Sequence, residues 1–263
     1  MRSLFFVWIF CSSLFAQIEE LDRFSSLESH LTKETLLILD IDDTLLIPVQ
    51  MLGCDEWFCH RLKEKGKTCD SNTALEKTLA EWEAIRHLSQ MQVVEPGTEA
   101  IITSLQERGF MMMGMTTQGL ALATRTHQQL VQNGFHIIRT TPMKGDCYLM
   151  VEDHGVLYRN GILFTSGTPK GPALFALFDQ MKFTPKRLVF VNDKKSHLRD
   201  VEQEAEKRGV EFVGLRYAYA DQHKALFSPD VAEYQYTHSS FGKILSDEEA
   251  TIAMNRELLL EAQ

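Results

Sequence analysis

Three carboxylates follow a short apolar run near the start of the chain: Asp40, Asp42 and Asp43 come directly after residues 35–39. The run has the composition of a strand buried on both faces. Residues two apart in an extended segment project to the same side, so Asp40 and Asp42 can face one cavity at the carboxyl end of that strand, where open α/β sheets bind ligands. A divalent cation would compensate buried carboxylates, and oxygen ligands suit Mg²⁺. The alternative is a solvated turn, which the buried strand disfavours.

Three further polar sites occur where other elements are expected to end or begin. Thr116 follows the apolar run at residues 110–115, Asn192-Asp193 follows the run at residues 187–191, and Lys170 begins a helical pattern. A strand that ends in threonine is commonplace, and a lysine beside a turn is often a surface residue. None of these residues alone therefore indicates a function.

In this order, the four segments resemble the motifs of the haloacid dehalogenase (HAD) superfamily. The match covers approximately residues 31–47 and 91–216. Most members of the superfamily are Mg²⁺-dependent phosphohydrolases. The resemblance implies that Asp40 is a nucleophile that forms an aspartyl-phosphate and that Asp42 is the general acid/base. The chemistry is sound, because an ionised carboxylate can attack phosphorus while a second carboxyl group handles the proton of the leaving group and of water.

The same resemblance implies roles for the other sites. The hydroxyl of Thr116 and the neighbouring amides would hold the phosphoryl oxygens, and Lys170 would offset the charge of nucleophile and phosphate. The implied ligands of Mg²⁺ are Asp40, Asp42 (through its backbone carbonyl), Asn192 and Asp193. Asn192 departs from the acidic pair of the family pattern, which removes one possible negative charge while still offering an oxygen.

Alternating elements of two kinds must position these residues. Short apolar runs predict strands at residues 35–39, 110–115, 187–191 and 210–215. Amphipathic patterns predict helices at residues 98–108, 120–132, 171–181 and 196–208, most of them followed by glycine. Strands that alternate with helices indicate an α/β fold, a three-layer Rossmann-like parallel sheet. Asn160-Gly161 between apolar runs predicts a β-hairpin, and a capping box at Ser246 predicts a C-terminal helix.

Residues 48–90 do not follow this alternation and are expected to form a small helical cap inserted after the first strand, with the core made by residues 17–47 and 91–263. A cap covers a site and sets substrate choice, as lids do generally. The segment includes a helical run at residues 73–89 and three cysteines, Cys54, Cys59 and Cys69. In an oxidising compartment such a cluster predicts at least one disulfide. A zinc site is the weaker alternative, because no CxxC pair is present.

The first 16 residues have the layout of a secretory signal peptide, with a basic start, an apolar run and small residues before Gln17. No later stretch approaches the length of a membrane span. We therefore expect an exported protein, periplasmic or secreted. The net charge of −9 argues against a general nucleic-acid binder, which would show a basic surface.

The sequence predicts an Mg²⁺-dependent hydrolase that acts on a small phosphorylated substrate, a phosphomonoester. The alternative is a catalytically weak or inactive protein of the same fold, kept as a binding or effector module. A phosphomutase would share the phospho-enzyme chemistry. The oligomeric state is not indicated.

Overall fold

The computed structural model describes residues 17–239 and 244–261. Its centre is an eight-stranded sheet in the order β1-β10-β9-β2-β5-β8-β7-β6. In chain order the strands of this sheet are β1 (Gln17–Leu21), β2 (Thr35–Asp40), β5 (Met111–Thr116), β6 (Cys147–Val151), β7 (His154–Arg159), β8 (Ile162–Phe164), β9 (Arg187–Asn192) and β10 (Glu211–Tyr217). The pairs from β1 to β8 in this order are parallel, whereas β7 is antiparallel to both β8 and β6.

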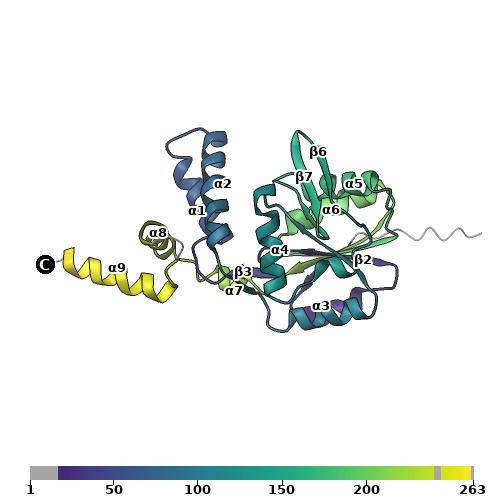
Figure 1. The fold of residues 1–263 in the computed structure, drawn as a ribbon, viewed down its shortest axis with the longest axis horizontal. Helices are drawn as coiled ribbons and strands as arrows, with labels where there is room; N and C mark the ends of the chain where they lie inside the picture. Colours follow the sequence, from purple (N-terminus) through teal and green to yellow (C-terminus); the bar gives the residue numbers. More distant parts are fainter. Residues whose placement is uncertain (1–16, 240–243, 262–263) are drawn as a thin grey trace, which may run out of the picture.

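Helices cover both faces of the sheet (Figure 1). The α-helices of the described chain are α1 (Asp55–Lys65), α2 (Ser71–Leu88), α3 (Thr98–Glu107), α4 (Ala123–Gln132), α5 (Lys170–Gln180), α6 (Lys195–Lys207), α7 (Asp221–Lys224), α8 (Pro229–His238) and α9 (Asp247–Glu261). Short 3₁₀ helices are η1 (Phe24–His30), η2 (Leu120–Leu122) and η3 (Ile137–Arg139). The predicted fold class, a three-layer α/β sheet with a helical cap and a hairpin, is confirmed.

Strand β2 lies in the middle of the sheet, and its six residues are all buried. Its side chains alternate between the two helical layers. Leu37 and Leu39 pack in the cluster that includes residues of α3 and α4, whereas Leu36 and Ile38 pack in the cluster that includes residues of α5 and α6. A strand covered on both faces has to be apolar throughout, which is why the sequence shows a continuous run rather than an alternating one.

The four strands predicted from apolar runs all form, and so does the hairpin, whose strands β7 and β8 meet at Asn160-Gly161. The helix expected at residues 120–132 begins with η2 before α4 starts at Ala123. The capping box at the start of α9 forms as predicted, because the Ser246 side chain accepts from the Glu249 N–H and the Glu249 carboxylate accepts from the Ser246 N–H. Strands β1 and β6 were not predicted.

Helices α1 and α2 lie between two short strands, β3 (Leu46–Pro48) and β4 (Met91–Val93), which pair antiparallel where the chain leaves and re-enters the core. Helix α8 contacts α1, and α9 packs on α8, both away from α5 and α6 (Figure 1). The Trp57 indole N–H donates to Glu233 of α8, and Gln235 accepts a hydrogen bond from the Leu52 N–H. The C-terminal helices therefore support the cap. The proposed boundaries at residues 48 and 90 stay a prediction.

The predicted disulfide among Cys54, Cys59 and Cys69 is wrong for this structure, in which all three thiols are free. Cys54 is the N-cap of α1, where its Sγ accepts a hydrogen bond from the Trp57 N–H, and Cys69 lies beyond the other end of that helix. An 11-residue helix is about 16 Å long, more than twice the Cα separation that a disulfide allows. Cys59 lies more than one helical turn from Cys54, which also exceeds that separation.

The predicted signal peptide, residues 1–16, lies outside the described residues. None of the helices in the described part of the chain is both long and apolar enough to cross a membrane.

Candidate active site

Asp40 ends β2, the central strand, between the ends of β5 and β9, and it is buried. Lys170, the first residue of α5, donates a hydrogen bond from Nζ to Asp40 Oδ1 at 2.6 Å, and its own side chain is 1% exposed. Burial raises the pKa of Asp40 to about 7, and the positive charge of Lys170 opposes this rise. The two residues form a buried ion pair at the carboxyl edge of the sheet.

The loop before α5 holds Lys170 in place. The backbone N–H groups of Thr165, Ser166 and Gly167 donate to the carbonyls of residues 116–118, so this loop is tied to the end of β5. At the next position a side chain would not fit, because a Cβ on Gly171 would lie 2.1 Å from the carbonyl oxygen of Asp200 in α6. This close approach of α5 to α6 brings Lys170 to the end of β2.

Asp42 is held by three donors from two other parts of the chain. Its Oδ2 accepts hydrogen bonds from Thr116 Oγ1 at 3.1 Å and from Gln118 Nε2 at 2.9 Å. Its Oδ1 accepts from Arg86 Nη2, on cap helix α2, at 2.5 Å. The carboxylate is therefore fixed between the end of β5 and the cap.

A third cation, Lys224, lies beside Asp193, which follows β9. Lys224 Nζ is 2.5 Å from Asp193 Oδ2 and 3.1 Å from Asp43 Oδ2. Asn192 lies inside the strand end, fully buried, and its Oδ1 accepts a hydrogen bond from the Lys194 N–H at 2.7 Å. The oxygen of Asn192 thus stabilises the turn after β9, and a role as a metal ligand stays a prediction.

The site carries more negative than positive groups among the described residues. Its carboxylates are Asp40, Asp42, Asp43, Asp55, Glu56 and Asp193, and its cations are Arg86, Lys170, Lys194 and Lys224. Burial raises the pKa of Asp43 to about 8, and the nearby carboxylates of Asp193, Glu56 and Asp55 add to the rise although Lys224 opposes it. A divalent cation beside these carboxyl groups would favour their ionised forms and so oppose the rise in their pKa values.

The donor atoms at the site also fit such a cation. Asp40 Oδ1 and Asp193 Oδ2 are bound by lysines, whereas the second oxygen of each carboxylate accepts no hydrogen bond within the described chain. Together with a backbone carbonyl, these are oxygen ligands of the kind that Mg²⁺ takes. The residues present therefore fit magnesium.

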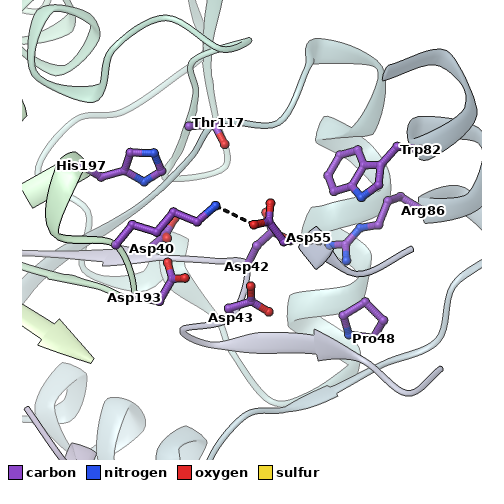
Figure 2. Close-up of a pocket in the computed structure, with 11 residues that line it drawn as sticks. Asp40, Asp42, Asp43, Pro48, Asp55, Trp82, Arg86, Thr117, Asp193 and His197 are labelled. Carbon is purple, nitrogen blue, oxygen red and sulfur yellow. Dashed lines mark hydrogen bonds and ion pairs between the residues drawn. The ribbon is translucent and has the colours of Figure 1, made fainter. Parts of the chain in front are cut away.

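These side chains surround a cavity of about 40 Å³ between the sheet and the cap. Figure 2 shows Asp40 and His197 on one side and Trp82 and Arg86 on the other. Burial lowers the pKa of His197 to about 3, with the positive charges of Lys170 and Lys194 acting in the same direction, so the imidazole is neutral. A volume of this size holds a few water molecules or one compact polar group.

The structure brings together five residues that the sequence singled out: Asp40, Asp42, Thr116, Lys170 and Asp193. Sequence reasoning missed several others in the same site: Arg86, Gln118, His197, Lys194 and Lys224. Gln118 had a local signal, since it lies two residues after a proposed site residue. The two lysines and Arg86 belong to helices and turns whose packing the sequence does not reveal.

Hydroxyl and aromatic side chains reach the cavity from both the core and the cap. The Thr116 hydroxyl donates to Asp42, while its neighbour Thr117 lines the cavity. Of the cap aromatics, Trp82 lines the cavity, whereas Trp57 is fully buried and packs within the cap.

Residues 18–251 match the protein family described as "Protein of unknown function (DUF2608)". The chain belongs to the DUF2608 family. A relative of this DUF2608 chain from Chlamydia pneumoniae is named "Putative outer membrane protein" and is 23% identical, covering 97% of this chain and 98% of its own length. Another, from Chlamydia trachomatis serovar D, has the same name and is 22% identical, covering 84% of this chain and 83% of its own length.

A solved structure described as a hydrolase from Pseudomonas syringae aligns to the DUF2608 chain with a TM-score of 0.41 and 14% identity. The alignment covers 74% of this chain and 99% of that one.

Proposed function

We propose that this protein is a Mg²⁺-dependent phosphomonoester hydrolase in which Asp40 is the nucleophile and Asp42 the general acid/base. The observation that supports it most is the buried Asp40–Lys170 pair, with its 2.6 Å contact, at the end of the central strand. Burial removes water that would otherwise solvate the carboxylate. Lys170 supplies positive charge next to the atom that would approach phosphorus.

In the first step, an Asp40 oxygen forms a bond to phosphorus and the bond from phosphorus to the leaving oxygen breaks. Asp42 gives a proton to that oxygen, which leaves as an alcohol. In the second step, Asp42 takes a proton from water, the water oxygen bonds to phosphorus, and the bond from phosphorus to Asp40 breaks, releasing phosphate. Thr116 and Gln118, which donate to Asp42 Oδ2, hold the carboxyl group in position for both transfers.

Asp40, Asp193 and the backbone carbonyl of Asp42 would hold Mg²⁺, which when bound neutralises charge on the transferred phosphoryl group. Lys224 keeps Asp193 in position through its 2.5 Å contact with Oδ2. This contact leaves Oδ1, the other carboxylate oxygen, for the metal. Lys170 does the same for Asp40.

The test is hydrolysis of a panel of phosphomonoesters by the chain from residue 17 onward, with Mg²⁺ and with chelator. Asp40→Asn should abolish turnover, and Asp42→Asn should lower it by about 10²- to 10⁴-fold, most for poor leaving groups. Asp179→Asn is the matched control, since Asp179 is exposed and pairs with Arg208 at the surface. Full activity of Asp40→Asn, or in excess chelator, would contradict the mechanism.

A binding or effector role is the second candidate. The observation that favours it is that cations already contact Asp42 and Asp193, each at 2.5 Å, so both carboxylates are compensated without a substrate. An inactive protein would show no turnover on any phosphomonoester yet bind a phosphate analogue in the presence of Mg²⁺.

We also propose export, which the apolar start of the chain and the names of the chlamydial relatives support. Material from the native host should begin near Gln17 when its N-terminus is sequenced. An intact Met1 would contradict export.

A further inference from the structure

Arg86 is a buried cation with one carboxylate partner. Its side chain is 3% exposed, and its Nη2 donates to Asp42 Oδ1 at 2.5 Å. Its Nε is buried and has no hydrogen-bond partner within the described chain. The guanidinium therefore depends on Asp42 for its counter-charge and still has a donor to offer.

Trp82 lies one helical turn before Arg86 on α2, so both side chains project from the same face of the helix. The guanidinium carbon of Arg86 is 5.1 Å from the centroid of the indole ring. The indole Nε1–H is buried and also has no partner among the described residues. Both residues line the cavity on the side opposite Asp40 (Figure 2). Two residues of this wall thus each carry a buried donor without a partner among the described residues, and Arg86 adds a positive charge.

The other donors on Asp42 do not depend on Arg86. Gln118 Nε2 donates to both carboxylate oxygens, at 2.9 Å to Oδ2 and 3.1 Å to Oδ1, and Thr116 donates to Oδ2, so Asp42 keeps its donors from the end of β5 if Arg86 changes partner. Arg86 itself needs an anion, because a buried guanidinium without a counter-charge is strongly unfavourable. An anionic group on the substrate can take that place, because Arg86 can exchange one anion for another.

We propose that Arg86 and Trp82 form a subsite for an anionic group on the leaving portion of the substrate, an inference that rests on the proposed hydrolase function. The substrate class is then a compact phosphomonoester that carries a carboxylate or a second phosphate close to the ester oxygen. The cavity of about 40 Å³ favours the compact members of this class. Arg86 is the specificity-determining residue, and Trp82 adds a hydrogen bond from its indole N–H.

The first test compares 2-phosphoglycolate with ethyl phosphate, esters that differ by a carboxylate in place of a methyl group. The wild type should prefer 2-phosphoglycolate in kcat/KM by about 10- to 100-fold, the range expected for a hydrogen-bonded charge pair. In Arg86→Gln this preference should fall to within about threefold, and in Trp82→Phe it should fall in part. Glycerol phosphate and a glycerol bisphosphate repeat the comparison for a second phosphate.

The ratio between two substrates isolates specificity, because damage to folding lowers both rates together. Arg86→Lys, which keeps the charge, should retain part of the preference if Arg86→Gln folds poorly. Arg125→Gln is the matched control: Arg125 donates to the Ser89 carbonyl beside the cap and does not line the cavity.

The second test separates this inference from the hydrolase proposal by measuring binding alone. Calorimetry on Asp40→Asn with Mg²⁺ compares 3-phosphonopropionate with propylphosphonate, neither of which can be hydrolysed. Tighter binding of the carboxylate compound, lost on adding Arg86→Gln, supports the subsite even if no ester is turned over. Equal binding of the two compounds, binding of neither, or a preference that survives in Arg86→Gln would overturn it, whatever the hydrolase assays show.

Discussion

Replacing Lys170 with methionine tests whether the ion pair at the end of β2 holds the site together. Methionine keeps most of the length of the lysine stem and its apolar contacts, including the neighbourhood of Phe190, whose ring centroid is 5.4 Å from Nζ. What the change removes is the ammonium group, 2.6 Å from Asp40 Oδ1. Asp40 then remains buried beside the carboxylates of Asp42 and Asp193, which both act to raise its pKa.

The magnitude follows from the distance and the burial. Two unit charges 2.6 Å apart attract by about 6 kcal/mol at an effective dielectric constant near 20. Desolvation of both groups offsets part of this attraction, so the pair as a whole adds little to stability. Removing one partner alone is different, because it leaves the other charge buried, at a cost of about 3–5 kcal/mol. We expect that loss in Lys170→Met.

The assay is urea unfolding of the single variants Asp40→Asn and Lys170→Met and of the double variant, all without divalent cations. Because the double variant buries no uncompensated charge, its loss in free energy of unfolding should be smaller than the sum of the two single losses by about 2 kcal/mol or more. Lys186→Met is the matched control. Lys186 contacts Glu34 at the surface with 75% of its side chain exposed, and its loss should cost less than about 1 kcal/mol.

Additive losses in the cycle, or a change below about 1 kcal/mol in Lys170→Met, would refute the reasoning. Either result would mean that the two groups do not depend on each other for compensation.

Three further predictions concern residues other than the Asp40–Lys170 pair. The lowered pKa of His197, about 3 against 6.5 when unfolded, means that unfolding takes up a proton below pH 6.5. The free energy of unfolding should therefore fall as the pH drops from 6.5 towards 3. In urea unfolding, the fall over that window should be smaller in His197→Phe than in the wild type by on the order of 2–4 kcal/mol. Glu95→Leu leaves the buried Tyr217 hydroxyl without its 2.8 Å acceptor and should lower the melting temperature, with a loss of about 2–4 kcal/mol. Gly171→Ala places a Cβ 2.1 Å from the Asp200 carbonyl and should cost about 1–3 kcal/mol in the same assay, while displacing Lys170 and lowering turnover.

The elements that carry the site could be predicted because they are buried on both faces. Strands β5 and β9 each pair with β2 in the middle of the sheet, and each of the three reads as a continuous apolar run with polar residues at its end. The edge strand β1 carries no such signal. β1 pairs with β10 alone, and its sequence is mostly polar, because one side of the strand lies at the edge of the sheet.

The C-terminal helices show a second limit of the sequence. The capping box at Ser246 predicted where α9 begins, because its hydrogen bonds are local. That α8 packs on the cap through Glu233 and Gln235 depends on contacts more than 170 residues apart in the chain. No pattern within either segment encodes such a contact.

The same distinction explains which half of the site the sequence revealed. The carboxylates Asp40 and Asp42 come from one turn, so their spacing is visible in the chain. The cations that compensate the acidic groups are Arg86, Lys170, Lys194 and Lys224, brought together from four segments. A surface lysine and a buried one look alike in a sequence, and only the buried position makes the residue depend on its partner. What distinguishes this site from other acidic turns is therefore the arrangement of its cations, and Arg86, which donates to Asp42 and lines the cavity from the cap, is the one that the proposed subsite depends on.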